Sequence, residues 1–332
     1  MAMQYLISTS TPKDWREWHG FALAASMGIV RLQGVSIEEV SLRPELIFGV
    51  LRRGHKLMIS GPSKAGKSYC LIAQAIALGL GLKWLGWQCM PSRVLYVNLE
   101  IDGASMLHRF NAVAQSMGVE FGDLPIDVLN LRGRIITAEI LAGKLEKLAA
   151  DGQYDAIIID PAYKIQSGVE NAAEDIAKFC NILDKIAEDT GAAVIYCTHH
   201  SKGNQQNKSS IDRASGSGVF ARDADAIIDL CPVARNQHFE IEATLREFKS
   251  PQPRIFEFVW PIHREVTDPA LLAKLTGSKA TRLQAAIEDL GGLGIATVAD
   301  VADALSCSTR TIQRQIKNDE SLTISGGVIH AE

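Results

Sequence analysis

Between Gly54 and about Leu230 the hydrophobic positions form short continuous runs, each followed by a longer segment with helical periodicity. Continuous apolar runs are typical of strands buried on both faces, whereas a strand with one wet face alternates apolar and polar residues. The pattern therefore predicts an α/β fold with a mostly parallel sheet covered by helices on both sides. The predicted strands are Lys56–Ser60, Arg93–Leu99, Ile126–Leu131, Asp155–Ile159, Ala192–Cys197 and Asp225–Leu230, and the predicted helices are Tyr69–Leu80, Ala104–Met117, Ala138–Ala150 and Ala173–Thr190.

The pattern changes after Leu230, where two segments alternate apolar and polar residues. His238–Glu247 and Arg254–Trp260 are predicted as antiparallel edge strands, with Pro251 and Pro253 in the turn between them. The predicted division is an N-terminal segment of residues 1–45, which is a candidate for subunit contact, a core of residues 46–262, a linker of residues 263–280 and a winged-helix-like C-terminal unit of residues 281–332.

The segment Gly61–Ser68 (GPSKAGKS) lies between the first predicted strand and the first predicted helix. It fits the pattern G-x-x-x-x-G-K-[ST], whose backbone N–H groups and helix dipole attract the phosphates of a nucleotide. Lys67 would reach the β- and γ-phosphates, and the Ser68 hydroxyl would coordinate Mg²⁺. A chance glycine-rich turn is the plainer alternative, and the strand-to-helix context argues against it. The predicted nucleotide-binding residues here are Gly61, Pro62, Ser63, Lys64, Ala65, Gly66, Lys67, Ser68 and Tyr69.

Polar residues with catalytic potential follow three other predicted strands. Asp160 closes DAIIID, where its carboxylate would hold Mg²⁺ beside the phosphate loop. Glu100 closes VLYVNLE, where it would orient or deprotonate the water that attacks the γ-phosphate, with Asp102 as the nearby alternative. His199 and His200 follow AAVIYCT and are predicted to sense the γ-phosphate. A zinc site is less favoured there because no further ligands lie at a suitable spacing.

Two cations, Arg246 and Lys249, lie on or just after an expected edge strand. Phosphoryl transfer is accelerated by a cation at the transition state, which a neighbouring subunit can supply. The alternative is an exposed pair of charges that protects a sheet edge from pairing.

The segment Thr297–Lys317 has the spacing of a helix-turn-helix, in which the first helix is Val298–Leu305 and the second follows the turn Ser306–Ser308. The second helix exposes Arg310, Arg314 and Lys317, which predicts DNA contact. Residues 278–332 carry five Lys and Arg against seven Asp and Glu, a net charge of −2, so protein binding stays open as an alternative.

Composition narrows the class of protein further. The 332 residues are 47% hydrophobic with a net charge of −4, which fits a globular chain and excludes a uniformly basic nucleic-acid coat. The six cysteines have no C-x-x-C spacing, so reduced thiols in a cytoplasmic protein are expected. No secretion signal and no long apolar run appears, so no membrane association is expected.

From about Arg43 to Pro253 the chain resembles the RecA-like ATPases, and most of all the AAA_25 / RepA-like family of plasmid and phage hexameric replicative helicases. The resemblance rests on the phosphate loop and on three further runs. These runs are RVLYVNLEID with Glu100, IIIDPAYKIQSGVENAAEDIAKF with Asp160, and TGAAVIYCTHHSKG followed by GSGVFARDADAIIDL. The double histidine followed by Ser-Lys-Gly is more particular to this family than the phosphate loop.

The resemblance implies a homo-hexameric ring that hydrolyses ATP with Mg²⁺ and moves on single-stranded DNA. Lys67, Ser68, Asp160 and Glu100 would form the hydrolysis site, His199 or His200 would couple nucleotide state to DNA, and Arg246 would reach the adjacent subunit's nucleotide. The polar loop Ser201–Ser217 would line the channel and contact DNA through Lys202, Lys208 and Arg213.

Three functions compete at this stage. The first is a helicase or translocase that replicates a plasmid, phage or integrated element, with a replication initiator or primase as a further partner. The second is an ATP-switched DNA-binding regulator or loader, which the helix-turn-helix favours. A small-molecule kinase is disfavoured because no acceptor-site pattern is visible.

Overall fold

The computed structural model describes residues 41–134, 137–152, 154–165, 173–200, 222–233, 237–276, 279–305, 307–319 and 321–331. The chain divides into two units, residues 1–44 and residues 45–332, and the account below concerns the second. Most of the predicted N-terminal segment, and the DNA-loop residues Lys202, Lys208 and Arg213, lie outside the described residues.

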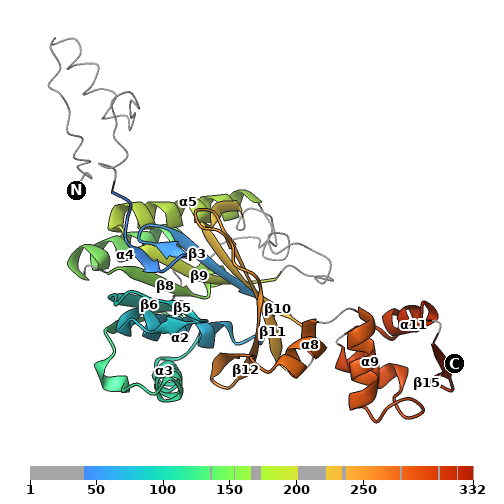
Figure 1. The fold of residues 1–332 in the computed structure, drawn as a ribbon. Coiled ribbons are helices and arrows are strands. Elements are labelled where there is room, and N and C mark those ends of the chain that lie inside the picture. The colour runs from blue at the N-terminus through green and yellow to red at the C-terminus, as the bar shows by residue number, and fades with distance from the viewer. Residues whose placement is uncertain are drawn as a thin grey trace, which may run out of the picture. The chain divides into compact units, whose positions relative to one another are not determined.

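The core is built on a nine-stranded sheet with the strand order β13-β12-β11-β10-β3-β9-β8-β6-β7 (Figure 1). Six strands from β10 to β7 are parallel, and β11, β12 and β13 continue the sheet in antiparallel pairing. The strand bounds are β3 Lys56–Gly61, β6 Val94–Asn98, β7 Ile126–Asn130, β8 Ala156–Asp160, β9 Ala193–His199, β10 Ala226–Pro232, β11 His238–Leu245, β12 Arg254–Val259 and β13 Ile262–Glu265. The predicted α/β fold with a mostly parallel sheet is confirmed.

Helices cover both faces of this sheet. The helices α2 (Lys67–Leu80) and α3 (Gly103–Met117) lie on one face, and α4 (Ala138–Gly152) and α5 (Ala173–Thr190) lie on the other (Figure 1). Neighbouring strand residues divide between two hydrophobic clusters, since Leu57 and Ile59 face α2 whereas Met58 faces α5. This alternation explains why the strands read as continuous apolar runs.

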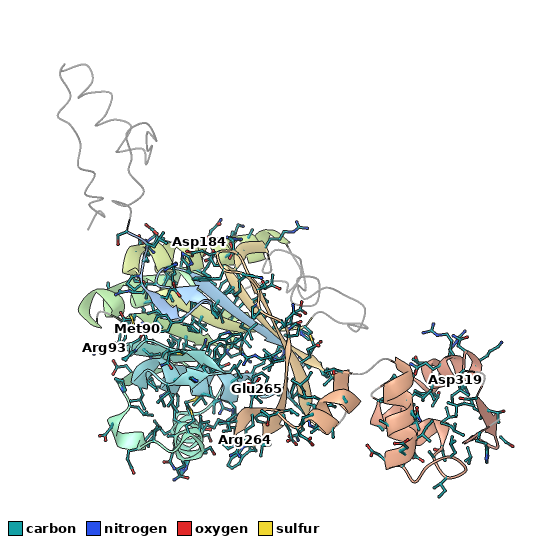
Figure 2. The ribbon with its side chains drawn as sticks, viewed as in Figure 1. Met90, Arg93, Asp184, Arg264, Glu265 and Asp319 are labelled. Atoms are coloured by element: carbon teal, nitrogen blue, oxygen red, sulfur yellow. The ribbon has the colours of Figure 1, made fainter. Side chains whose placement is uncertain are left out.

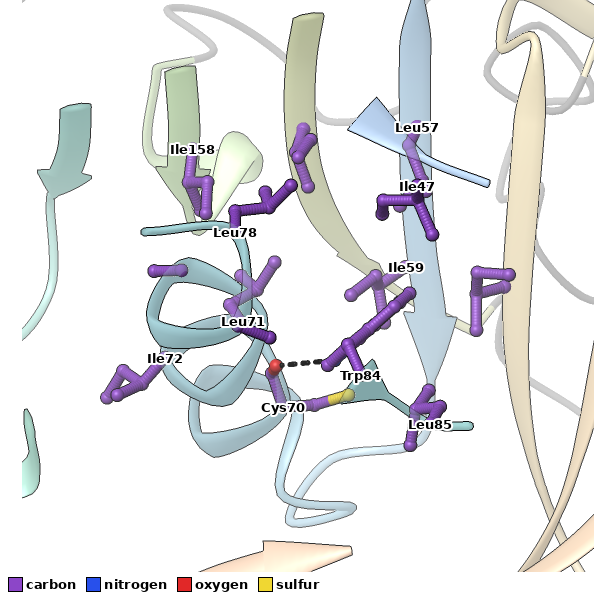
Figure 3. Packing of buried hydrophobic residues seen from close by; sticks show 14 of the residues in the cluster. Ile47, Leu57, Ile59, Cys70, Leu71, Ile72, Leu78, Trp84, Leu85 and Ile158 are labelled. Atoms are coloured by element: carbon purple, nitrogen blue, oxygen red, sulfur yellow. Dashed lines mark hydrogen bonds between the residues drawn. The ribbon is translucent and has the colours of Figure 1, made fainter. Parts of the chain in front are cut away.

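Two short hairpins complete the cluster around α2. They are β1 (Glu45–Ile47) with β2 (Leu51–Arg52), and β4 (Lys83–Trp84) with β5 (Trp87–Gln88). The indole of Trp84 packs beside α2 and donates a hydrogen bond of 3.1 Å to the carbonyl of Cys70 (Figure 3). The hairpin thus supports the first turn of α2, which carries the phosphate loop.

The far edge of the sheet differs from the prediction. The strand β11 is internal, and β13, which falls partly in the expected linker, forms the edge. The four residues of β13 (IHRE) show no apolar run, and pairing with β12 orders them, helped by the 3.1 Å ion pair between Arg254 and Glu265 (Glu265 is labelled in Figure 2). A short helix, α8 (Pro269–Thr276), then occupies the rest of the expected linker.

The C-terminal residues form a small cluster with its own core. It contains α9 (Lys279–Asp289), α10 (Val298–Ala304), α11 (Thr309–Lys317) and the hairpin of β14 (Leu322–Ser325) with β15 (Val328–Ala331). The side chains of Thr297 and Ser308 cap α10 and α11. Asp319, just after α11, is labelled in Figure 2. Among the described residues, no helix is long and apolar enough to cross a bilayer.

Candidate nucleotide site

The phosphate loop joins β3 to α2 at the carboxyl end of the parallel strands. Lys64 and Gly66 adopt positive φ angles of 66° and 76°, which turn the chain from the strand into the helix. At Gly66 a Cβ atom would lie 2.8 Å from the ring of Phe258, so this position excludes any larger residue. The loop therefore ends in a closely packed glycine at the N-terminus of α2, and helix N-termini attract anions.

Lys67 is buried at the base of this loop, with 7% of its surface exposed. Its ammonium donates to the carbonyls of Gly61 and Pro62 at 2.8 and 2.7 Å and lies 3.2 Å from Nδ1 of His199. Burial lowers the pKa of Lys67, and the nearby carboxylates of Asp160 and Glu100 oppose that shift. The geometry places a cation where the predicted phosphates would lie.

Asp160 ends β8 and is buried at the centre of the site. Its carboxylate accepts hydrogen bonds from the hydroxyls of Ser68 at 3.2 Å and Tyr96 at 2.7 Å, and from the thiol of Cys197 at 3.2 Å. Burial raises the pKa of Asp160, while these three donors lower it. Ser68 and Asp160, the two oxygen ligands that the sequence predicts for Mg²⁺, thus lie within hydrogen-bonding distance of each other.

Glu100 lies just beyond the end of β6 and is exposed. The turn that carries it is held by Asn98, whose side-chain oxygen accepts from the N–H groups of Glu100 and Ile101 at 3.3 and 3.0 Å. The Glu100 charge is close enough to raise the pKa of Lys67 and of Asp160. Asp102, the competing carboxylate, instead caps α3 by accepting from the N–H of Ser105 at 2.9 Å.

The two histidines at the end of β9 point in different directions. His199 lies beside Lys67, and its pKa is lowered by burial and by the Lys67 charge. His200 turns away, and its Nε2 lies 2.6 Å from the buried carboxylate of Asp229 on β10. The structure thus brings His199 to the phosphate loop through its side chain, whereas His200 reaches the loop only through its backbone N–H, which donates to Gly61 at 3.2 Å.

Arg246 and Lys249 lie near the amino ends of the parallel strands, at the opposite end from the phosphate loop. Arg246 follows β11, and the start of β10 pairs with both the end of β11 and the start of β3, so Arg246 lies near the amino end of β3. Its guanidinium donates to Asp225 at 3.1 Å and to the carbonyl of Arg222 at 2.5 Å. The structure therefore does not bring Arg246 or Lys249 to the nucleotide site of their own chain.

An aromatic group covers the outer side of the phosphate loop. Phe258 packs on Gly66, and Nε2 of His263 lies 3.1 Å from the carbonyl of Ala65. Trp260 is 64% exposed, and its indole N–H donates to the hydroxyl of Tyr69 at 3.1 Å. Phe258, Trp260 and His263 come from β12, the turn after it and β13. They are far from the phosphate loop in the sequence and reach it only in the folded chain.

The site as a whole fits a nucleotide with Mg²⁺. The four strands β3, β6, β8 and β9 place the loop, Glu100, Asp160 and His199 at one edge of the sheet, because parallel strands end on the same side. Sequence reasoning missed Tyr96, Asn98, Cys197 and Asp229, which hold the predicted residues in place. They lie inside apolar strand runs, a pattern that by itself indicates core positions.

Comparison with known proteins agrees with this geometry. The fold is that of the RecA-like ATPase domains found in DnaB-like helicases. A solved structure described as an ATPase domain matches with a TM-score of 0.53 and 12% identity over 77% of this chain and 99% of that chain. "The Structure Of A DnaB-Like Replicative Helicase And Its Interactions With Primase" matches with a TM-score of 0.52 and 14% identity over 73% and 69% of the two chains.

The profile of the AAA_25 family, described as an AAA domain, matches residues 34–205, which is more than half of the chain. The protein therefore belongs to the AAA_25 family. No curated protein matches its sequence.

Proposed function

We propose that the protein is a Mg²⁺-dependent ATPase that drives a DNA helicase or translocase. One observation carries the ATPase assignment: the phosphate loop with Lys67, the Ser68–Asp160 pair, Glu100 and His199 meet at the carboxyl edge of one parallel sheet. Phosphoryl transfer needs little covalent chemistry from a protein, so a set of positioned charges of this kind suffices.

Each group has a role that follows from its surroundings. Bound Mg²⁺ supplies positive charge to the phosphate oxygens, and Ser68 with Asp160 would hold it. Lys67 exchanges its loop carbonyls for phosphate oxygens. The neighbouring ammonium favours a lone pair on Nδ1 of His199, so Nε2 carries the proton and donates toward the γ-phosphate. Glu100, exposed and at the rim, orients the attacking water and accepts its proton.

The aromatic residues beside the phosphate loop, Tyr69 and Trp260, offer a surface for the nucleobase. The helix-side end of a phosphate loop holds the α-phosphate, so the ribose and base extend from there toward Tyr69 and the exposed ring of Trp260. Stacking of a base on an aromatic ring contributes about 1–3 kcal/mol.

Substituting Trp260 tests this placement. We expect Trp260→Ala to weaken ATP binding about 5- to 150-fold, which is the stacking contribution expressed as an affinity ratio. Trp260→Phe keeps a ring and serves as the matched control, for which most of the affinity remains. Equilibrium titration with a fluorescent ATP analogue measures both, and equal affinities for Trp260→Ala and the wild type contradict the stacking role.

The helicase assignment further requires a ring and a DNA path. In the proposed homo-hexamer, Arg246 and Lys249 would complete the site of the adjacent subunit, since they lie at the edge of the sheet away from their own loop. Lys202, Lys208 and Arg213 are proposed to contact single-stranded DNA. The similarity to a DnaB-like replicative helicase that interacts with primase supports a replication role. Replication of a plasmid, phage or integrated element, with primase or an initiator as partner, is a further part of this proposal.

Strand displacement on a forked DNA with ATP tests the helicase directly. The wild type is expected to separate the strands, and Glu100→Gln is expected to bind the fork without separating it. A chain that stays monomeric with ATP in light scattering, or that hydrolyses ATP on DNA without unwinding, would contradict the ring helicase.

ATP hydrolysis on DNA without unwinding would instead support an ATP-switched regulator or loader, and the C-terminal cluster favours that alternative. The helix α11 buries Ile312 and Ile316 and exposes Arg310, Arg314 and Lys317 on its other side. With the hairpin that follows, this arrangement fits a winged-helix unit that binds DNA through α11.

Charge removal on α11 tests the DNA-binding proposal. We expect Arg310→Ala and Arg314→Ala each to weaken duplex binding and, where the side chain contacts a phosphate, to reduce the slope of log affinity against log salt by about 1. Asp303→Asn on α10 changes an exposed charge in the same cluster and serves as the control. Unchanged salt slopes in both arginine variants would favour a protein partner for this cluster.

A further inference from the structure

Asp229 is an unusual residue for its position. It lies within β10, between β3 and β11 in the sheet, and none of its surface is exposed. An ionised carboxylate in such a place costs several kcal/mol of desolvation, and an apolar side chain of similar size is often as stable or more so. Burial of the strand AIIDLC would be more favourable with an apolar residue in place of Asp229. Stability alone therefore does not explain the carboxylate, which points to a functional role.

Three side chains lie within hydrogen-bonding distance of the Asp229 carboxylate. Its Oδ1 accepts from the hydroxyl of Ser60 and lies 2.6 Å from Nε2 of His200, and its Oδ2 accepts from the thiol of Cys231 at 3.0 Å. Burial raises the pKa of Asp229, but the hydrogen bond and charge of His200, with the other two donors, bring it down to about 2. The carboxylate is therefore ionised at neutral pH and acts as a fixed acceptor for His200.

The geometry of this contact crosses the strand that carries the phosphate loop. The sheet order is β10-β3-β9, so a side chain from the end of β9 passes over the end of β3 to reach β10. The backbone N–H of His200 also donates to the carbonyl of Gly61, the first residue of the loop. The tip of β9 is thus attached to its neighbour β3 and, across β3, to β10, at the point where the phosphate loop begins.

This attachment adds to the pairing of His199 with Gly61 in fixing the backbone of the preceding residue. His199 and His200 are consecutive, so fixing the backbone and ring of His200 leaves His199 directed toward Lys67, 3.2 Å away. Without a fixed tip, His199 would have to be ordered at each binding event, which costs side-chain entropy. A preorganised donor is the form that phosphoryl transfer exploits.

We propose that Asp229 is a positioning residue, which through His200 holds His199 against Lys67 so that the site distinguishes ATP from ADP. This inference rests on the proposed ATPase function. Asp229 touches neither nucleotide nor metal in this account, and its effect passes entirely through the two histidines.

The test measures the ratio of ATP to ADP affinity by titration with fluorescent analogues, together with kcat. We expect His199→Ala to lower the ratio at least about 10-fold, the loss of one hydrogen bond to a charged phosphate. Asp229→Asn should lower it by a comparable factor, because the amide is neutral and puts an NH2 donor in place of one of the two oxygens that accept from Ser60, His200 and Cys231. In the double variant the two losses should not multiply, because both remove the same interaction. Multiplicative losses, or a wild-type ratio in folded Asp229→Asn, would overturn the proposal.

A matched pair at position 200 keeps the proposal testable if Asp229→Asn does not fold. The amide nitrogen of Gln occupies nearly the place of Nε2, which contacts Asp229, whereas that of Asn corresponds to Nδ1, which does not. We expect His200→Gln to keep the wild-type ratio and His200→Asn to behave like His199→Ala. The reverse order contradicts the proposal. If instead the wild type fails to distinguish ATP from ADP, or His199→Ala has no effect, the proposed role of the site itself fails.

Discussion

Lys67→Ala is expected to lower kcat/KM for ATP by at least about 100-fold and to weaken ATP binding by a similar factor. The ammonium is the buried cation of the phosphate loop, and its two carbonyl partners at 2.8 and 2.7 Å show that it is already directed into the loop. Removal of a single preorganised donor to a developing charge typically costs about 10²- to 10³-fold in rate. Phosphate release and nucleotide titration measure the two effects separately.

The matched control is Lys147→Ala, which removes a lysine from the exposed surface of α4. This variant should bind and hydrolyse ATP like the wild type. Should Lys67→Ala retain wild-type affinity and turnover while remaining folded, the phosphate-loop assignment would be wrong.

Glu100→Gln is expected to reduce kcat by about 10²- to 10⁴-fold while leaving ATP affinity within a few-fold of wild type. The amide keeps the size of the side chain and one acceptor oxygen but cannot accept the proton of the attacking water. Because Asn98 holds the backbone of the turn, the substitution should not disturb the loop. Single-turnover hydrolysis distinguishes a chemical defect from a binding defect.

Asp102→Asn discriminates between the two carboxylates of this turn. Asp102 caps α3, and Asn is also a good capping residue, so this variant should retain both stability and turnover. A large loss of turnover in Asp102→Asn with normal turnover in Glu100→Gln would transfer the catalytic role to Asp102.

The sequence pattern predicted the parallel core well, and the reason is physical. Strands such as Asp155–Ile159 are buried on both faces. A continuous apolar run therefore predicts them, because a surface helix does not show such a run. The order of the strands in the sheet cannot be predicted from these runs, since it depends on which apolar faces pack together. The edge strand β13 was missed because the four residues IHRE contain no apolar run. The helix α8 was missed because its eight residues are fewer than the window over which helical periodicity is recognised.

The site shows the same division. Glycine, lysine and serine at fixed spacing identify a phosphate loop because the spacing itself determines the geometry. Asp229 and Tyr96 could not be identified from spacing, since their partners lie 29 and 64 residues away in the chain. The one signal available for Asp229 was a charged residue inside an apolar strand, which a burial argument flags as costly.

The central claim is tested most directly by the steady-state rate of phosphate release from ATP, measured with and without single-stranded DNA. The account predicts Mg²⁺-dependent hydrolysis that DNA stimulates in the wild type and that is lost in Glu100→Gln at unchanged ATP affinity. Hydrolysis that is absent from the folded wild type, or that persists undiminished in Glu100→Gln, would contradict it.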